Sequence, residues 1–358
     1  MKIVTVAYLH GAGGAERQII LLSNQLAIRG HEVVLCVLVD NLSTYPIDER
    51  VRIVDLTSVE NTARTSVGKI VKRLIAFRKF IKKEKPDIII NYNLQSAYFC
   101  LTLSREQRGK VIYSERGDPY DDEYTGILGK LRDVTVPRMD GLVFQSEGAR
   151  DFFDDRVKGK SVVIHNSVNV PQEQYPIPSV REKRIINVGR LHPQKNQALL
   201  IDAFSQISNA FSEYILEIYG DGELQAALEN QINNLELKER VRIIPSRKDL
   251  WNCIYNASLF VLSSDFEGMP NALIEAMALG LPCISTDCRP GGARSLIENG
   301  VNGIIVPVRQ VKDLSWAMSQ CLSKPEMSEK LALNAREIVK THSEKVLFDK
   351  WDQFLMKI

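Results

Sequence analysis

Two glutamates, Glu267 and Glu275, are separated by seven residues in a segment that begins with loop residues and continues as a helix. The loop reads Glu-Gly-Met-Pro-Asn, and residues 272–279 are good helix formers that stop at Gly280. We predict that Asn271 caps this helix. A carboxylate only accepts hydrogen bonds, which suits it to sugar hydroxyls such as those of a ribose. On their own, the two glutamates could equally be an exposed loop acid and a solvated helix residue.

Two cations, Arg190 and Lys195, stand five positions apart and flank a turn in another segment. An arginine can grip a diphosphate with its planar fork, and a lysine can do so as a point charge. Cations in a loop can also simply be solvated. Both segments follow short buried strands, at residues 184–188 and 257–264. This places them at the carboxyl ends of strands, where open α/β sheets bind ligands and helix dipoles favour anions.

The alternation of buried strands and amphipathic helices runs along the whole chain. Its strand patterns lie at residues 2–8, 33–39, 87–91, 110–114, 141–146, 184–188, 216–219, 257–264 and 283–287. A chain of 358 residues is long for one core, so we predict two doubly wound α/β domains. We place them at residues 1–168 and 169–342, joined by a proline-containing linker, with an amphipathic tail helix at residues 343–358.

Composition excludes several classes of protein. Hydrophobic residues make up 44% and charged residues 25%, as in ordinary water-soluble proteins, and no apolar run is long enough to span a membrane. The chain starts directly with a strand pattern rather than a signal peptide, which predicts a cytoplasmic protein. The six cysteines form no CxxC pair, which predicts reduced thiols and no zinc site. A net charge of +2 and the absence of a nucleic-acid motif argue against nucleic acid as a partner.

Glycine-rich turns precede two helices. Gly13 and Gly14 follow the first strand, and Gly220 and Gly222 follow the strand at 216–219. Glycines at such places let a ligand approach the backbone, and the helix start suits an anion. The first turn lacks the dinucleotide fingerprint G-x-G-x-x-G, so a purely structural tight turn explains it equally well.

A basic helix is predicted at residues 69–85, where Pro86 ends it. Its predicted apolar stripe consists of Ile70, Leu74, Phe77 and Ile81. On the opposite side lie Lys69, Lys72, Lys79 and Lys83. The segment holds eight basic residues against one acid. This face could be solvated, or it could attract anionic lipid headgroups or the pyrophosphate of an acceptor.

The segment from Phe266 to Asp287 resembles the E-x7-E signature of the retaining family 4 glycosyltransferases. Gly-Arg-Leu-x-x-x-Lys-Asn, from Gly189, resembles the pyrophosphate clamp of that family, and Gly-Gly-Ala-Glu-Arg resembles its opening. The resemblance covers nearly the whole chain and is strongest over residues 184–307. It implies a GT-B fold, in which two Rossmann-like domains face a central cleft and the tail helix crosses back to the first domain.

The resemblance also implies roles for residues. Arg190 and Lys195 would stabilise the leaving diphosphate, Glu275 would hold the ribose, and Glu267 would position the sugar. The implied donor site comprises Gly13, Gly14, Gly189, Arg190, Lys195, Gly220, Gly222, Arg247, Glu267, Gly268, Met269, Pro270, Asn271, Ala272, Leu273 and Glu275. No cofactor and no metal are expected, because the cations neutralise the diphosphate and no Asp-x-Asp motif is present.

The sequence departs from the family after the strand at 110–114. Many members carry a histidine there, whereas this chain reads Ser-Glu-Arg-Gly-Asp-Pro, a form that resembles enzymes of bacterial polysaccharide and O-antigen assembly. Glu115 and Arg116 are our candidates for contacting the reacting sugar. In a plain reading of the sequence, these two residues form a surface ion pair.

The resemblance implies a UDP-linked donor, with UDP-GalNAc as our first choice, and a polyprenyl-pyrophosphate-linked saccharide as acceptor. UDP-Gal, UDP-Glc and GDP-mannose stay open as donors. Retention without an evident nucleophile suggests front-face attack by the acceptor hydroxyl. The enzyme is expected on the inner face of the plasma membrane as a peripheral protein. Two lower-ranked readings are a catalytically idle binding protein of the same fold and a UDP-sugar 2-epimerase.

Overall fold

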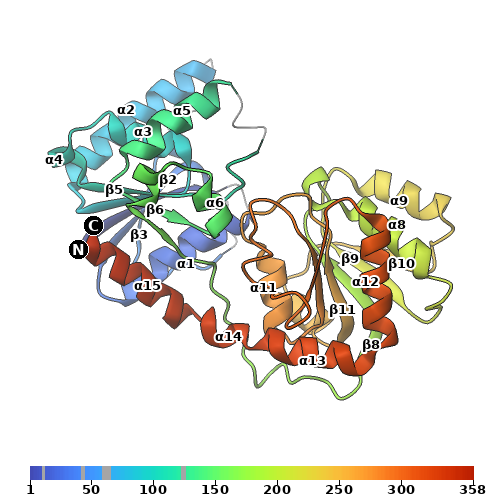
Figure 1. Ribbon diagram of the computed structural model, residues 1–358. Coiled ribbons are helices and arrows are strands. Elements are labelled where there is room, and N and C mark those ends of the chain that lie inside the picture. The colour runs from blue at the N-terminus through green and yellow to red at the C-terminus, as the bar shows by residue number, and fades with distance from the viewer. Residues whose placement is uncertain (10–12, 42–44, 59–65, 122–125) are drawn as a thin grey trace. The chain divides into compact units, whose positions relative to one another are not determined.

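The computed structural model describes residues 1–9, 13–41, 45–58, 66–121 and 126–358. The chain divides into two compact units (Figure 1). The first consists of Met1–Asn166 together with Leu347–Ile358, and the second of Ser167–Val346. Each unit is built around one parallel sheet, so the prediction of two doubly wound α/β domains is confirmed.

The first unit contains a seven-stranded sheet in the order β3-β2-β1-β4-β5-β6-β7. Its strand order reverses beside β1, which pairs in parallel with both β2 and β4. The strands are β1 Lys2–Leu9, β2 Glu32–Asn41, β3 Arg52–Asp55, β4 Ile88–Asn91, β5 Lys110–Ser114, β6 Gly141–Phe144 and β7 Ser161–Val163. The short β3 was not predicted, because its side chains are largely exposed and give no buried-strand pattern.

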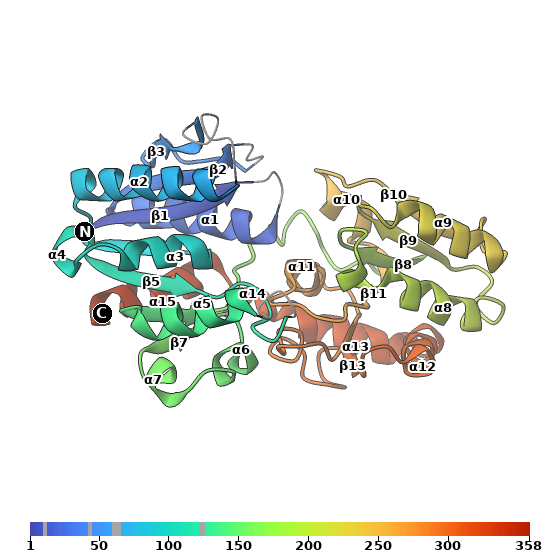
Figure 2. The ribbon, with the colours of Figure 1, turned by 90° about the horizontal axis from the view of Figure 1, so that it is seen from above.

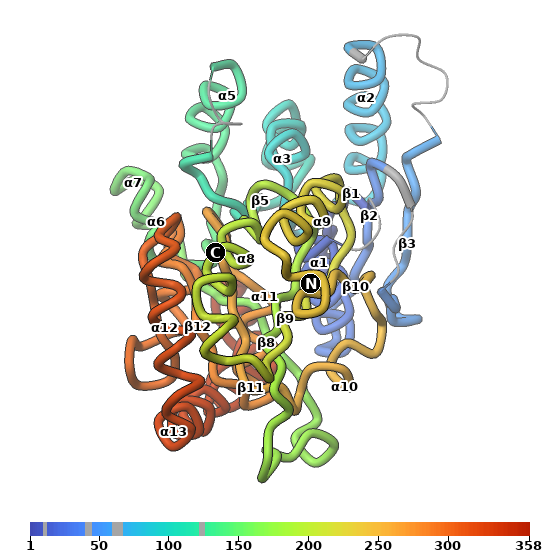
Figure 3. The backbone as a smooth tube through the Cα atoms, turned by 90° about the vertical axis from the view of Figure 1, so that its right-hand side faces the viewer, coloured from blue at the N-terminus to red at the C-terminus, as the bar shows by residue number. Residues whose placement is uncertain are grey.

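Helices cover both faces of this sheet. Figures 1 and 3 show α2, α3 and α5 as one layer, with α1 and α15 on the other face. The helices are α1 Gly14–Ile28, α2 Ser66–Glu84, α3 Leu94–Leu101, α4 Arg105–Arg108, α5 Ile127–Thr135, η3 Val136–Arg138, α6 Glu147–Asp151, α7 Asp155–Lys158 and α15 Glu344–Lys357. Helix α15 is the tail, and ion pairs hold it to the first unit: the Arg29 guanidinium lies 2.7 Å from Asp349 and 2.6 Å from Asp352.

The second unit contains a six-stranded parallel sheet in the order β10-β9-β8-β11-β12-β13. The strands are β8 Glu182–Val188, β9 Ile215–Tyr219, β10 Val241–Ile244, β11 Ala257–Leu262, β12 Cys283–Thr286 and β13 Ile304–Val306. Its helices are η4 Pro193–Lys195, α8 Gln197–Ile207, α9 Gln225–Asn234, α10 Leu250–Ile254, α11 Asn271–Ala278, α12 Val311–Ser323, α13 Pro325–Arg336 and α14 Ile338–Thr341 (Figure 2). Strands β8 and β11 are neighbours, which brings the loops that follow them to the same edge of the sheet.

Within the described ranges, no helix is long and apolar enough to cross a bilayer.

The predicted apolar stripe of α2 is only partly right. Phe77 and Ile81 are fully buried, whereas Ile70, one of the four predicted stripe residues, is 41% exposed. Ile70 lies in the first two turns of α2, where the helix packs less closely than at its carboxyl half.

Candidate functional site

The strand, loop and helix around Glu267 have the predicted order. Strand β11 ends at Leu262 and helix α11 begins at Asn271. The prediction that Asn271 caps the helix is wrong, because Pro270 occupies the N-cap position. Its carbonyl accepts hydrogen bonds from the backbone N–H groups of Leu273 and Ile274, both at 3.1 Å. The helix ends at Gly280 as predicted, where φ is +72°, a conformation that favours glycine.

The centre of this site is a buried ion pair between Lys195 and Glu267, which are 72 positions apart in the sequence. Their side chains are 17% and 8% exposed. The Ser264 hydroxyl donates to the same Glu267 Oε1 at 2.8 Å. The side-chain carbons of Lys195 lie over Gly189, where a Cβ would meet them at 3.3 Å. The structure therefore brings together residues from the two segments that the sequence singled out.

Arg190 lies beside this pair in the chain but differs from Lys195 in its surroundings. It is exposed, and its guanidinium makes no hydrogen bond or ion pair with the residues that the structure describes. Its backbone oxygen accepts hydrogen bonds from the Gln197 side chain and from the His192 N–H, both at 2.9 Å. The Lys195 ammonium is paired with Glu267, whereas the exposed Arg190 guanidinium remains available to an anionic ligand.

Two of the predicted donor-site glycines, Gly220 and Gly222, have a packing role that the sequence did not reveal. A Cβ on Gly220 would lie 2.0 Å from the carbonyl oxygen of Gly189, and one on Gly222 would lie 2.4 Å from that of Leu191. The loops after β8 and β9 thus touch backbone to backbone. In the Glu267 loop, a Cβ on Gly292 would meet the oxygen of Gly268 at 2.2 Å.

Other predicted donor-site residues contribute in different ways. Met269 and Leu273 point into the hydrophobic core, so only their backbone is available to a ligand. Pro270 is also buried, whereas Ala272 is partly exposed. Arg247 lies in the loop after β10 and pairs with Asp249 at 2.9 Å.

Glu275 is buried on α11 and accepts a hydrogen bond from the indole N–H of Trp251 at 3.2 Å. Trp251 belongs to α10, which follows the loop of Arg247. The sequence analysis missed this residue. The signal that could have found it is an aromatic residue four positions after Arg247, a predicted donor-site residue.

In the first unit, Glu115 follows β5 and is 2% exposed. It accepts hydrogen bonds from the Tyr113 hydroxyl at 2.9 Å and from the backbone N–H groups of Gly117 and Arg116 at 3.0 and 3.1 Å. Burial raises the pKa of Glu115 above its ordinary value. The plain reading of an exposed ion pair with Arg116 is wrong, because both side chains are drawn into separate buried networks.

The Arg116 guanidinium lies over the ring of Tyr92, with 3.9 Å between the guanidinium carbon and the ring centroid. It donates to Asn166 Oδ1 at 3.0 Å and to the Tyr92 hydroxyl. Burial lowers the pKa of Arg116. Tyr92 and Asn166 follow β4 and β7, and were missed although polar residues after parallel strands share one edge of a sheet.

Tyr92, Glu115 and Arg116 line a cavity of about 530 Å³ at the carboxyl ends of β1, β4 and β5. Three tyrosines, Tyr8, Tyr92 and Tyr113, contribute to its wall, together with Gln95, Glu115 and Arg116. The size is typical of pockets for small molecules. A mixed aromatic and hydrogen-bonding wall suits a saccharide, whose rings present both apolar faces and hydroxyl groups.

The remaining predicted residues are not among those that line this cavity. Gly13 precedes α1 and Gly14 opens it, and the Gly13 N–H donates to Glu16 at 3.4 Å; His10–Ala12 are outside the described residues. On α2, Lys69, Lys79 and Lys83 are exposed and Lys72 is partly exposed. In the described parts of the chain, no three His, Cys, Asp or Glu side chains are grouped to hold a metal ion.

Two family models match the chain side by side. "Glycosyltransferase Family 4" matches residues 12–172 and "Glycosyl transferases group 1" matches residues 172–338. The junction between them falls close to the boundary between the two compact units. Both candidate regions, around Glu115 and around Glu267, lie inside the matched ranges.

Known relatives are similar to the chain over different lengths. An N-acetylgalactosamine-N,N'-diacetylbacillosaminyl-diphospho-undecaprenol 4-alpha-N-acetylgalactosaminyltransferase from Campylobacter jejuni is 25% identical over 98% of this chain and 96% of the relative. A UDP-Gal:alpha-D-GlcNAc-diphosphoundecaprenol alpha-1,3-galactosyltransferase from Escherichia coli is 35% identical over 35% of this chain and 32% of the relative. Among solved structures, Anabaena HepE in complex with UDP is similar over 100% of both chains, with a TM-score of 0.81 and 18% identity. This likeness confirms the GT-B fold that the sequence predicted.

Proposed function

The chain belongs to glycosyltransferase family 4, and from this premise we propose that it transfers a hexose or N-acetylhexosamine from a nucleotide sugar to a lipid-linked saccharide, with retention of configuration. The observation that carries the proposal is the buried Lys195–Glu267 pair at the carboxyl edge of the second sheet, beside the exposed guanidinium of Arg190. Cations at this edge suit a nucleoside diphosphate.

The donor diphosphate would lie between Arg190, Lys195 and the start of α11. The negative charge on the leaving diphosphate grows in the transition state, and preorganised cations and a helix dipole stabilise that growth. Glu267 would accept hydrogen bonds from the sugar, helped by the backbone of Gly268–Asn271. Glu275, held by Trp251, would accept them from the ribose hydroxyls, and the loop of Arg247 would seat the base.

We propose that the transfer needs no metal and no cofactor: Arg190 would pair with the diphosphate, and Lys195, which pairs with Glu267 in this structure, would turn to the diphosphate when the donor binds. In that case the departing diphosphate oxygen itself can take the proton of the acceptor hydroxyl on the same face of the sugar. The bond from the anomeric carbon to the diphosphate breaks as the bond to the acceptor oxygen forms. This front-face course retains the anomeric configuration without a covalent enzyme intermediate.

UDP-GalNAc is the donor that we propose first. Support comes from the Campylobacter jejuni relative, whose name specifies transfer of N-acetylgalactosamine to a diphospho-undecaprenol saccharide. The Escherichia coli relative names UDP-Gal instead. UDP-Gal therefore stands as the second candidate, with UDP-Glc and GDP-mannose after it.

The acceptor saccharide would occupy the cavity of the first unit that Tyr8, Tyr92, Glu115 and Arg116 line. Aromatic rings can pack against the apolar faces of sugar rings, and the Arg116 guanidinium can donate hydrogen bonds. An acceptor of this kind carries a polyprenyl pyrophosphate, which would be a component of bacterial surface glycan synthesis at the inner face of the plasma membrane.

We propose that α2 brings the enzyme to that membrane surface. Its basic side chains Lys69, Lys79 and Lys83 are exposed, and so are the apolar side chains of Val71 and Ile75. Helix α5 lies in the same helical layer, on the far side of α3 from α2 (Figure 3), and adds two further exposed apolar side chains, Ile127 and Leu128. Cations attract anionic headgroups, and apolar side chains can enter the interface.

Thermal stabilisation by a panel of donors tests the proposed donor site. UDP, GDP, UDP-GalNAc, UDP-GlcNAc, UDP-Gal and GDP-mannose are added separately, with and without EDTA. A ligand that binds only the folded state raises its melting temperature. We expect UDP compounds to raise it equally in EDTA, and the preferred sugar to show turnover with a polyprenyl-pyrophosphate saccharide. No shift with any nucleotide contradicts the proposal, and a shift abolished by EDTA contradicts metal independence.

Vesicle flotation tests the membrane proposal separately. Replacing Lys69, Lys72, Lys79 and Lys83 with serine should weaken binding to anionic vesicles at low salt. The matched control replaces four lysines of the second unit, Lys312, Lys324, Lys330 and Lys340, with serine. Unchanged flotation of the α2 variant, or an equal loss in the control, assigns these lysines to an ordinary solvated face.

A further inference from the structure

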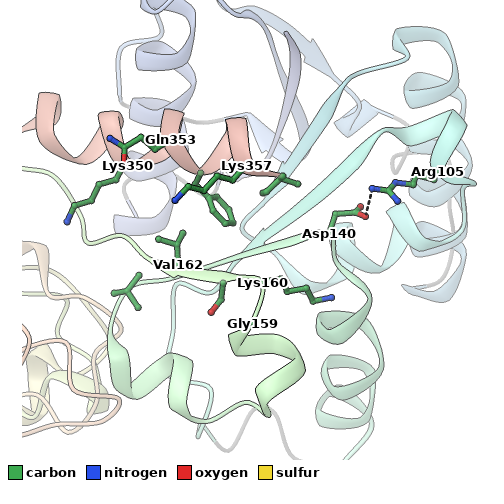
Figure 4. Close-up of a pocket in the computed structure, with 12 residues that line it drawn as sticks. Arg105, Asp140, Gly159, Lys160, Val162, Lys350, Gln353 and Lys357 are labelled. Atoms are coloured by element: carbon green, nitrogen blue, oxygen red, sulfur yellow. Dashed lines mark ion pairs between the residues drawn. The ribbon is translucent and has the colours of Figure 1, made fainter.

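A second cavity, of about 640 Å³, lies in the first unit beside the edge strand β7 and against α15 (Figure 4). Asp140 and Lys160, which line it, directly precede β6 and β7. The cavity is therefore at the amino end of these strands, whereas Tyr92 and Glu115 follow the carboxyl ends of β4 and β5. Strands of four to five residues separate the two ends by roughly 13–17 Å.

One wall of this cavity is apolar. Phe354 comes from α15, Ile358 directly follows that helix, and Val162 and Val163 come from β7. Both valines are partly exposed, because β7 is the last strand of the sheet and pairs only with β6. The volume is within the range of small-molecule pockets, and the wall could take an aliphatic chain.

The rim is basic, and part of its charge is already neutralised. Asp140 is the one acid among the lining residues, and Arg105 and Arg108 approach it at 3.6 and 2.8 Å. The Lys160 ammonium donates to the carbonyl oxygens of Pro137 and Met139, each at 2.6 Å. These groups are therefore engaged within the protein.

Two cations remain, Lys350 and Lys357, both on α15. They are seven positions apart, so they lie on one side of the helix, with Gln353 between them in the sequence (Figure 4). With the residues that the structure describes, neither lysine forms a hydrogen bond or an ion pair. The apolar wall is thus bordered by two unneutralised positive charges.

We propose that this cavity binds an amphiphilic phosphate, with its apolar chain against Phe354 and Val162 and its phosphate at the ammonium groups of Lys350 and Lys357. Lysine is a common phosphate ligand and acts as a point charge. The site is additional to glycosyl transfer, because its residues belong to neither the proposed donor site nor the proposed acceptor cavity. A membrane lipid and a soluble amphiphile share this chemistry.

Calorimetric titration of the full chain with dihexanoyl phosphatidic acid tests the site. Dihexanoyl phosphatidylcholine has the same chains but no net charge, so it tests the role of the charge. Inorganic phosphate has the charge but no chain, so it tests the role of the chain. We expect phosphatidic acid to bind at least ten times more tightly than either of them. No binding of phosphatidic acid, or equal binding of all three probes, overturns the proposal.

Two variants locate the binding. Lys350→Ser combined with Lys357→Ser removes the charge, and Val162→Glu places a carboxylate against the apolar chain while keeping both lysines. All three side chains are at least partly exposed, so folding should be preserved. Each variant should weaken phosphatidic acid at least tenfold, whereas Lys312→Ser with Lys330→Ser in the second unit should not. A change of less than twofold in both cavity variants, or an equal loss in the control, overturns the assignment.

Flotation with vesicles that contain phosphatidic acid then separates the two sources of ligand. If the lysine double variant also floats less than the unaltered chain, the site takes a lipid from the bilayer. If it floats equally but has lost the short-chain ligand, the site takes a soluble amphiphile. Both results support the phosphate site. Neither measurement depends on transferase activity, so a failure of this proposal is distinguishable from a failure of the proposed function.

Discussion

Glu267 and Glu115 are both buried at the carboxyl edge of a sheet, one in each unit, and they are stabilised in different ways. Glu267 forms an ion pair with Lys195 and accepts a hydrogen bond from Ser264. Glu115 accepts hydrogen bonds from the Tyr113 hydroxyl and from backbone N–H groups, and it forms no ion pair within the described residues. A buried carboxylate with a cation is readily kept charged, whereas one without a cation is not.

The difference shows that distance along the chain is a poor guide to pairing. Glu115 and Arg116 are adjacent, yet the Arg116 guanidinium turns to Tyr92 and Asn166. Lys195 and Glu267 meet although 72 positions separate them, because their loops follow the neighbouring strands β8 and β11. Sheet topology, rather than sequence proximity, decides which charges are neutralised.

The largest expected effect concerns the pair in the second unit. Glu267→Gln or Lys195→Ala should lower turnover at least ~100-fold, on the scale of losing one contact that stabilises a transition state. The measurement is the rate of sugar transfer from the preferred donor, together with the unfolding midpoint of each variant. The double variant should lose little more than either single one, because the two residues act as a unit.

An exposed ion pair of the same unit provides the matched control. Lys183 and Glu213 form it with side chains that are 50% and 68% exposed. Lys183→Ala and Glu213→Gln should leave turnover unchanged, because exposed pairs contribute little. Near-normal rates in the Lys195 and Glu267 variants would mean that this pair is not part of the active site, so its difference from Glu115 would have no catalytic meaning.

Arg116→Lys tests whether the first unit acts on the acceptor alone. A lysine keeps the charge but cannot stack on Tyr92 while donating to Asn166. We expect turnover to fall about tenfold, the scale of losing one to two kcal/mol of contacts, with unchanged stabilisation by UDP. Arg138→Lys, on the exposed surface of the same unit, is the control. A lost response to UDP would mean that Arg116 serves the donor, contrary to the division of roles.

Much of the fold followed from patterns that carry strong physical constraints. Short, mostly apolar runs such as residues 257–262, followed by loop residues, favour buried strands in a parallel sheet, and they were placed within a few residues. The weakest strands were missed, since β3 is mostly exposed and β13 spans three residues. The exposure of Ile70 was missed because helical periodicity gives a face but not what covers it.

The candidate site could be predicted only as far as local motifs reach. The motif gave Lys195 and Glu267 but not Ser264, whose contact depends on how the loop folds back onto β11. Trp251 and Tyr92 come from elements that carry no such motif and approach through the topology of each sheet. The Pro270 cap was mispredicted because residue preference alone put a hydrogen-bonding side chain at that position.

A smaller effect is expected where the second unit holds Glu275. Trp251→Phe removes the indole N–H that positions this carboxylate but keeps an aromatic ring. Losing one hydrogen bond of about 1 kcal/mol should raise KM for the donor about fivefold and leave kcat nearly unchanged. Trp316→Phe, on an exposed side chain, is the control. A fall in kcat with KM unchanged would contradict a role for Glu275 at the ribose and bring it closer to the reacting sugar.

The last prediction concerns the pH dependence of stability and tests Glu115, the glutamate that is buried without a cation. Burial raises the pKa of Glu115 above its ordinary value of 4.5. The unfolded chain then releases this proton at a lower pH than the folded chain does, so the folded state loses stability as pH rises above about 4.5. Glu115→Gln cannot ionise, and its free energy of unfolding should therefore decline less between pH 5 and pH 8. Denaturant unfolding at both values measures this slope, and Glu213→Gln should leave it unchanged. An equal slope in Glu115→Gln and the unaltered chain would mean that hydrogen bonds alone stabilise the ionised Glu115 as well as a cation would.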